Sequence, residues 1–269
     1  MPEVDQSPNR IRRITVRAER EVAYESPDHL IPFGTRLNNS RHARFNKKLY
    51  ELYGMDVPLR ILDLGCSGGG FVKDCLDDGC LAVGLEGSDY SWKHRRAEWA
   101  TIPDYLFTCD VTRNFNLELV IGEKKEPLQF DVVTSWELIE HIAEPDLERV
   151  AANVKKHMAP GGIWIMSVSP NEEVINGTVL HQTVQQKAWW VKKFQSLGLE
   201  HHESLVCYFN TQFIRGPKFR ATGSFHLVLS PDRNPIPPIP AEGLKERLFD
   251  HWHGSLIQRL LKLAVVGTN

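Results

Sequence analysis

Residues 61–71 read ILDLGCSGGGF, an apolar run that contains Asp63 and leads into a glycine-rich turn and the start of a helix. A second acid, Glu86, ends the next apolar run, which reads LAVGL at 81–85. The pattern predicts a strand, a tight turn and a helix whose N-terminus faces a ligand, then a strand whose terminal carboxylate binds two hydroxyl groups. We therefore expect a nucleoside-containing cofactor at the carboxyl edge of a parallel sheet.

The glycine-rich turn departs from the pattern that binds dinucleotides. In a Gly-x-Gly-x-x-Gly turn the backbone approaches a pyrophosphate, but here Gly65 is followed by Cys66 and Ser67. Asp63 stands two residues before Gly65, where its carboxylate repels a pyrophosphate and attracts a cofactor that carries an ammonium and a sulfonium. The run resembles motif I of the class I S-adenosylmethionine (SAM) methyltransferases, Asp-x-Gly-x-Gly-x-Gly, with Ser67 at the middle glycine and Gly69 at the last.

Strand and helix patterns alternate along the middle of the chain. We expect strands at 60–64, 81–86, 105–108, 130–135, 162–168, 204–209 and 223–229. Helices are expected near 70–78, 90–99, 144–158 and 184–197. Such alternation with short connections indicates βαβ units and a parallel sheet. The predicted class is α/β: a Rossmann-like class I methyltransferase sandwich, with a mostly parallel seven-stranded sheet that has an antiparallel edge, an N-terminal lid helix and a C-terminal helix.

The sequence divides into three parts. Residues 1–38 hold an arginine-rich arm and a proline-punctuated lid segment that is expected to be non-helical. The arm is expected to be a solvated or partly ordered tail, or else an electrostatic handle for phosphate or an anionic surface. Residues 39–230 form the expected methyltransferase domain, which opens with a lid helix at 41–53. Residues 231–269 form a proline-rich linker and an amphipathic helix at 242–264. We expect this helix to pack on the domain, with docking to a second copy of the chain, as in a homo-oligomer, or to a membrane surface as weaker alternatives.

The composition excludes several classes of protein. The chain has 269 residues, 42% of them hydrophobic and 25% charged, and a formal net charge of −2. These values are ordinary for a globular domain, and the charge argues against extensive nucleic-acid binding. The five cysteines follow no zinc or disulfide spacing and the N-terminus has no apolar signal region, so we expect a cytoplasmic protein. No apolar stretch is long enough to span a bilayer.

The resemblance to the SAM methyltransferases implies roles for particular residues. It places Asp63 and Gly65 at the methionine part of SAM, and Glu86 at the ribose hydroxyls. It places Asp110 at the exocyclic amine of adenine, with the backbone N–H of Val111 at the ring. The cofactor-binding residues that it implies are Asp63, Gly65, Cys66, Ser67, Gly69, Glu86, Gly87, Asp110, Val111 and Trp136.

A cluster of acids and a histidine follows the fourth expected strand, in the run WELIEHI at 136–142. If this run begins a helix, Glu137 and His141 lie on one face and Glu140 borders it. His181, beyond the fifth strand, is a fourth candidate ligand for a divalent metal ion. His181 and His141 are also the candidate catalytic bases, because an imidazole titrates near neutral pH.

The Glu-x-x-Glu-His run with a distant histidine resembles two branches of the SAM methyltransferases, over roughly residues 60–200. These are the ubiquinone-type O-methyltransferases and the small-RNA 2′-O-methyltransferases; SVSPN at 167–171 also resembles a turn of the RNA enzymes. The run occurs in methyltransferases without a metal too, so both kinds of site stay open.

We expect a SAM-dependent methyltransferase that acts on a hydroxyl of a polar small molecule or of a sugar or glycan. The alternatives are an RNA 2′-O-methyltransferase with a divalent metal, which the net charge disfavours, and a catalytically inactive SAM-binding partner subunit. A dehydrogenase is the least favoured.

Overall fold

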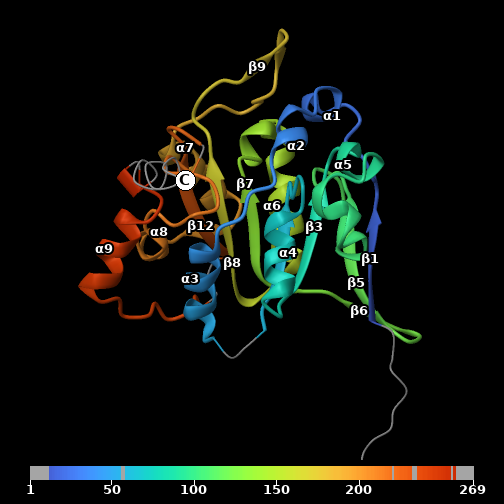
Figure 1. Cartoon of the computed structure of the whole chain (residues 1–269). Helices are drawn as coiled ribbons and strands as arrows, with labels where there is room; N and C mark the ends of the chain where they lie inside the picture. Colours follow the sequence, from blue (N-terminus) through green and yellow to red (C-terminus); the bar gives the residue numbers. More distant parts are fainter. Residues whose placement is uncertain (1–11, 56–57, 220, 232–234, 256, 259–269) are drawn as a thin grey trace, which may run out of the picture.

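The computed structural model describes residues 12–55, 58–219, 221–231, 235–255 and 257–258. A seven-stranded sheet forms its centre (Figure 1). In spatial order the strands are β11 (Leu199–His201), β12 (Phe225–Pro231), β8 (Met158–Val168), β7 (Phe130–Trp136), β2 (Arg60–Leu64), β3 (Leu81–Glu86) and β4 (Leu106–Thr108). Six of these strands run in the same direction, and β12, which lies between β11 and β8, runs opposite to them. The predicted α/β class and the mostly parallel seven-stranded sheet are confirmed.

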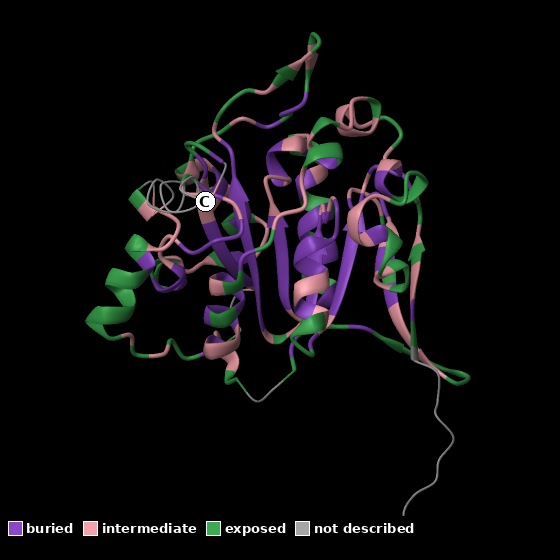
Figure 2. Cartoon of the chain, in the orientation of Figure 1, coloured by how far each residue is buried: buried purple, intermediate pink, exposed green. Residues whose placement is uncertain are grey.

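Helices cover both faces of the sheet because its strands are apolar on both sides. One face carries α3 (Ala43–Tyr53), α4 (Gly70–Asp77) and α8 (Glu203–Phe209), and the other carries α6 (Leu147–His157) and α7 (Lys187–Ser196). Phe45 belongs to the core of the first face and Phe194 to that of the second. Strand β2 serves both, since Ile61 points into the first core and Leu62 into the second. Figure 2 shows the buried residues gathered in the sheet and on the helix faces that meet it.

Most of the strands predicted in the central domain are confirmed to within a few residues, but the expected strand at 204–209 is wrong. These residues form α8, whose buried Leu205, Tyr208 and Phe209 recur at helical spacing. The strand in this part of the sheet is the three-residue β11. A short apolar run such as ESLVCYF fits a strand or a buried helix equally well by pattern, and here the tertiary packing selected the helix.

The arginine-rich arm is not a solvated tail where the structure describes it. A three-stranded antiparallel sheet forms from β1 (Arg12–Ala18), β5 (Phe115–Ile121) and β6 (Lys124–Pro127). Ile14 is buried in the main core, while Arg13 and Arg17 alternate onto the exposed face. The alternating apolar residues Ile14, Val16 and Ala18 are the signal for this strand in the sequence, where they stand among arginines. Arg10 lies outside the described residues.

The segment before the domain is more helical than expected. Two short helices, α1 (Pro27–Leu30) and α2 (Phe33–Leu37), occupy the run predicted to be non-helical. Ser26 caps α1 because its Oγ accepts a hydrogen bond from the N–H of Asp28, 3.3 Å away. Helix α3 confirms the helix predicted at 41–53, and its N-cap is His42, whose side chain accepts a hydrogen bond from the N–H of Phe45.

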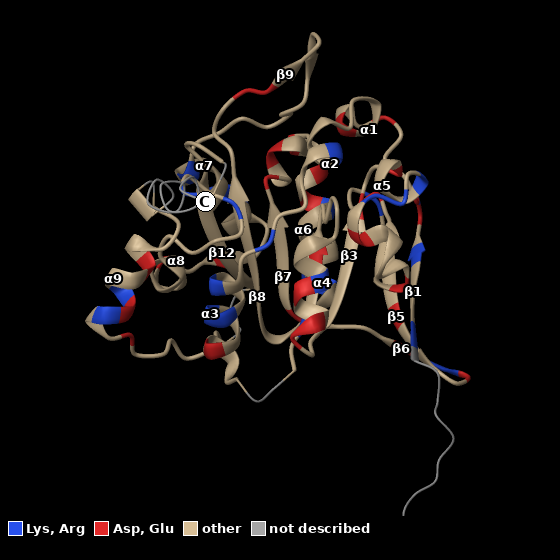
Figure 3. Ribbon diagram, in the orientation of Figure 1, with Lys and Arg blue, Asp and Glu red and all other residues tan. Residues whose placement is uncertain are grey.

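Shorter elements connect the larger ones. They are α5 (Tyr90–Lys93), the hairpin of β9 (Val174–Ile175) and β10 (Thr178–Val179), and 3₁₀ turns at Ala97–Ala100, Pro103–Tyr105, Ile139–His141 and Glu144–Asp146. The hairpin projects beyond the carboxyl edge of the sheet (Figure 1). In the view of Figure 3, lysines and arginines are interspersed with acids, in keeping with the near-neutral net charge.

The C-terminal helix is shorter than the predicted span of 242–264. Helix α9 (Leu244–Trp252) stops before Gly254, whose φ is 73° and whose Cα packs on Phe219 so closely that an added Cβ would lie 2.7 Å from the ring. Much of the rest of the predicted span lies outside the described residues. None of the described helices combines the length and the apolar character needed to cross a membrane.

Candidate functional site

The carboxyl edge of the parallel strands opens into a cavity of about 600 Å³. Acids at three strand ends line it, as the sequence predicts: Asp63 on β2, Glu86 on β3 and Asp110 just after β4. The other predicted cofactor residues that line it are Gly65, Cys66, Ser67, Gly87, Val111 and Trp136. Gly69 does not line the cavity; it is the N-cap of α4, at a φ of 82°.

The glycine-rich turn is held in an unusual backbone conformation. Gly65 and Ser67 have φ values of 71° and 49°, a region that residues other than glycine seldom adopt. Two hydrogen bonds fix Ser67 there: its N–H donates to Glu86 Oε2 at 2.8 Å, and its Oγ donates to the carbonyl oxygen of Asn38 at 2.8 Å. The turn is therefore tied to the end of β3 on one side and to the α1–α2 segment on the other.

The carboxylates near the ends of β2 and β3, Asp63 and Glu86, are buried. Burial raises the pKa of Asp63 to about 7, against the hydrogen bond that Thr134 Oγ1 donates to it at 2.7 Å. Burial also raises the pKa of Glu86, against the N–H groups of Ser88 and Ser67. A ligand that brings an ammonium or hydroxyl donors would stabilise the ionised form of both groups.

The α1–α2 segment closes one side of the cavity, and sequence reasoning did not find its individual contacts. Thr35 Oγ1 lies 3.4 Å from Glu86 Oε1, and Asp28 lines the same cavity from α1. The predicted lid helix, α3, contributes no lining residue and packs on the sheet instead. The predicted lid segment before residue 39, and not the predicted lid helix at 41–53, therefore borders the cavity.

A model of a protein family described as a methyltransferase domain matches residues 33–216. The chain belongs to this methyltransferase family. The ubiquinone biosynthesis O-methyltransferase of Idiomarina loihiensis is 25% identical over 160 residues, which are 52% of this chain and 61% of that protein. The small RNA 2′-O-methyltransferase of Mus musculus is 25% identical over 181 residues, which are 65% of this chain and 45% of that protein.

The comparisons establish the cofactor and the fold. The crystal structure of an S-adenosylmethionine-dependent methyltransferase from Clostridium acetobutylicum matches with a TM-score of 0.50 and 14% identity, over 76% of this chain and 95% of that one. That likeness shows the fold alone. The family match and the curated relatives, not the structural likeness, make this protein a SAM-dependent methyltransferase with SAM as its cofactor. The chain spans about half the length of the curated relatives that it matches, from 46% to 61% for the first two.

The run at 136–142 of this methyltransferase is not the helix considered in the sequence analysis. Glu137 has a φ of 50°, a strained conformation of the kind that clusters at functional sites, and only residues 139–141 form a 3₁₀ turn. The Glu137 carboxylate turns to Ser224, whose Oγ donates to Oε2 at 2.8 Å. Glu137 lines the cavity but does not join the group of candidate metal ligands, because the spacing of an α-helix does not apply.

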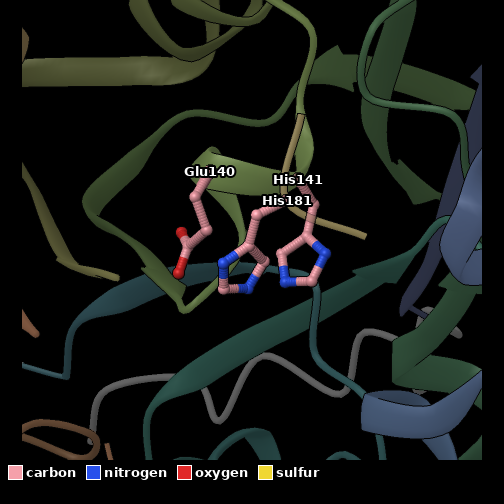
Figure 4. A group of neighbouring side chains, drawn as sticks. All are labelled: Glu140, His141 and His181. Carbon is pink, nitrogen blue, oxygen red and sulfur yellow. The ribbon is translucent and has the colours of Figure 1, made fainter. Parts of the chain in front are cut away.

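The other three predicted residues come together. Glu140, His141 and His181 each offer a ligand atom within 4.8 Å of the others, and Figure 4 shows the three side chains converging. The imidazole rings meet edge to face with centroids 4.5 Å apart. The N–H groups of Gln182 and Thr183 both donate to the carbonyl oxygen of Glu140, which ties the His181 loop to the 3₁₀ turn.

The three groups have different electrostatic surroundings. Burial, with the charge of Glu137, raises the pKa of Glu140 to about 8. Burial disfavours a charged His141, but the hydrogen bond and charge of Asp28, whose Oδ2 lies 2.8 Å from Nδ1, outweigh it and raise the pKa to about 9. Burial lowers the pKa of His181. At neutral pH, His141 is therefore the cationic imidazole of the pair and His181 the neutral one.

One wall of the cavity comes from a loop for which the sequence predicts no role. The loop before β12 contributes Ile214, Arg215, Ala221, Thr222 and Ser224 to the lining. It is joined to the end of β8, since Asn171 Nδ2 donates to the carbonyl oxygen of Thr222 at 3.2 Å. In the sequence, two glycines, Gly216 and Gly223, in a stretch without periodic apolar residues indicate a loop here.

Proposed function

We propose that this SAM-dependent methyltransferase acts on a hydroxyl of a polar small molecule or of a sugar or glycan. The observation that carries the proposal is the ring of His181, which lines the same cavity as the strand-end acids. Transfer to a hydroxyl requires a base that removes its proton while the oxygen attacks the methyl group in line. His141 and His181 are the candidates for this base.

The hydrogen bonds distinguish the two histidines. His181 Nδ1 lies 2.5 Å from the carbonyl oxygen of Asn171, which can only accept, so Nδ1 carries the hydrogen and Nε2 the lone pair. Glu173 Oε2 lies 3.4 Å from Nε2 and would stabilise the imidazolium formed when Nε2 takes a proton. We therefore assign His181 as the base, and His141 as a fixed positive charge that Asp28 holds beside it.

The relatives and the lining support the same acceptor class. The curated relatives named ubiquinone biosynthesis O-methyltransferase methylate oxygen by their printed name, which favours an oxygen acceptor here. Around His181 the cavity wall carries hydrogen-bonding groups: Ser169, Asn171, Glu172, Glu173, Gln182 and Thr222. A polar acceptor loses hydrogen bonds to water when it binds, and these groups can replace them.

In the same proposal, SAM binds along the strand ends, with Asp63 at its ammonium, Glu86 at its ribose hydroxyls and Asp110 at its adenine. We expect Glu86→Ala to weaken binding of S-adenosylhomocysteine, the product of SAM, roughly 100-fold, because two charge-assisted hydrogen bonds to the ribose are lost. Isothermal titration calorimetry measures this. Glu126→Ala, at an exposed position on β6, is the matched control and should bind normally. Unchanged affinity in Glu86→Ala would remove the ribose assignment.

A second candidate is RNA 2′-O-methylation with a divalent metal ion, favoured by the converging donors Glu140, His141 and His181. They fit such an ion, because one carboxylate and two imidazoles suit a borderline cation, and the buried Glu140 Oε2 has no hydrogen-bond partner among the described residues. When bound, the ion would lower the pKa of an acceptor hydroxyl. The mouse small RNA 2′-O-methyltransferase among the relatives supports this candidate too.

Methyl label and a chelator separate the two candidates. Purified protein is incubated with labelled SAM and an extract of the source cells, with and without EDTA, and the products are fractionated. We expect label in a small-molecule or glycan fraction, at the same level with EDTA, because His181 needs no metal to accept a proton. Label in nuclease-sensitive material that disappears with EDTA and returns with added Mn²⁺ would establish the second candidate instead.

A further inference from the structure

We propose that Arg215 is an anion-binding residue of the cavity, which takes a carboxylate or phosphate of a bound molecule. The proposal rests on the cavity being the site of methyl transfer, but not on which atom of the acceptor is methylated. It starts from the position of Arg215 in the loop before β12, a loop that lines the cavity from the side opposite β3 and β4.

The main chain of Arg215 is fixed from behind. Its carbonyl oxygen accepts a hydrogen bond from His226 Nε2 at 2.8 Å. His226 stacks on Phe213 with ring centroids 3.7 Å apart, and burial lowers its pKa to about 4, so it remains a neutral donor. Gly216 packs so closely against the imidazole of His226 that an added Cβ would lie 2.6 Å from the ring. These contacts hold the main chain at Arg215 in place. Little main-chain freedom is therefore lost when the side chain binds a ligand.

The side chain of Arg215 has donors to spare. Its Nη1 donates to Asn38 Oδ1 at 3.2 Å, and within the described ranges no carboxylate lies in ion-pair distance of the guanidinium. The other two arginines of the cavity wall are already paired: Arg20 with Glu25 and Arg113 with Asp146. A guanidinium has five N–H donors in a planar fork that matches a carboxylate or a phosphate, so Arg215 retains the geometry for a two-point contact.

The location of Arg215 admits two sources for the anion. Through Asn38 it adjoins Ser67, and hence the turn where the methionine part of SAM, with its carboxylate, is proposed to bind. Its own loop also contains Thr222 and Ser224, which are hydrogen-bonded to Asn171 and Glu137, on the part of the cavity wall where the acceptor is proposed to bind. The guanidinium of Arg215 could therefore bind either the carboxylate of the cofactor or an anionic group of the acceptor.

Binding measurements with Arg215→Gln test the proposal without an acceptor. The probes are S-adenosylhomocysteine, 5′-methylthioadenosine, which lacks the amino acid part, and inorganic phosphate titrated into protein saturated with S-adenosylhomocysteine. We expect the variant to lose about tenfold or more in affinity for one anionic probe, and nothing for methylthioadenosine. Loss for S-adenosylhomocysteine identifies the cofactor carboxylate, and loss for phosphate alone identifies an acceptor anion. Arg215→Lys should recover only part of the affinity, because a point charge does not replace the fork.

Three results would overturn the proposal: unchanged affinity for both anionic probes, an equal loss for methylthioadenosine, or an equal loss in Arg113→Gln, the matched variant of an arginine already paired. The melting temperature of each variant is recorded, so that a folding defect is recognised. None of these readouts depends on methyl transfer. An error in the proposed hydroxyl chemistry would therefore leave the result for Arg215 standing.

Discussion

His181→Ala should slow methyl transfer roughly 10³-fold, in the range typical for loss of a general base. The reason is specific to the contacts of the ring: the Asn171 carbonyl fixes its tautomer, and Glu173 stands by to stabilise the charged form. Affinity for S-adenosylhomocysteine should stay within about twofold of wild type, because the strand-end acids are untouched. Single-turnover transfer from labelled SAM and calorimetry measure the two quantities.

His201→Ala is the matched control for this experiment. His201 lies on β11 beside Glu203 and does not line the cavity, so its loss should leave the transfer rate near wild type. His181→Ala turnover close to that of the control would refute the assignment of His181 as the base. If turnover in wild type instead depends on added Mn²⁺, the same histidine acts as a metal ligand.

Asp250→Ala should lower the free energy of unfolding by about 3 kcal/mol, since it leaves a buried charge without its main partner. Asp250 is fully buried on α9, with Oδ2 2.8 Å from Lys48 Nζ and Oδ1 2.7 Å from Arg44 Nε. The Lys48 side chain is also fully buried, between this carboxylate and Glu242. Because Glu242 remains in the variant, the expected loss is at the lower end of the range for a broken buried ion pair.

The same pair gives stability a pH dependence with a definite sign. Burial acts to raise the pKa of Asp250, but Arg44 and Lys48 outweigh it and lower the pKa. A carboxylate whose pKa is lowered by folding stabilises the fold above its unfolded pKa, and this stabilisation is lost as the pH falls through the lowered value. Urea unfolding at pH 7 and at acid pH should therefore show wild type approaching Asp250→Ala as the solution is acidified.

Glu246→Ala is the control for the stability measurement. Glu246 is an exposed acid on the same helix, and its loss should cost below about 1 kcal/mol. Asp250→Ala that unfolds at the same urea concentration as this control would show that α9 is not held to α3 through the ion pair.

The sequence alone was enough to predict the acids that line the cavity. Asp63, Glu86 and Asp110 each lie at or near the end of an apolar run, and the carboxyl ends of parallel strands meet at one edge, so the local pattern was enough to bring them together. It also identified Glu140, His141 and His181 as neighbours, although the helical spacing invoked for the first two does not occur.

Only the tertiary structure decided the rest, because those features depend on partners far apart in the chain. Glu137 is hydrogen-bonded to Ser224, 87 residues away in the sequence, and does not join the candidate metal ligands. Arg215 is hydrogen-bonded to Asn38, 177 residues away. Asp250 looks like one more polar residue of an amphipathic helix until Lys48, 202 residues earlier, is placed beside it. A period of 2 or 3.6 residues shows which face of an element is buried, but not which element will cover it. The acids that line the cavity could be predicted because one sheet edge gathers them, whereas the loop before β12 lines the cavity through contacts that no local pattern encodes.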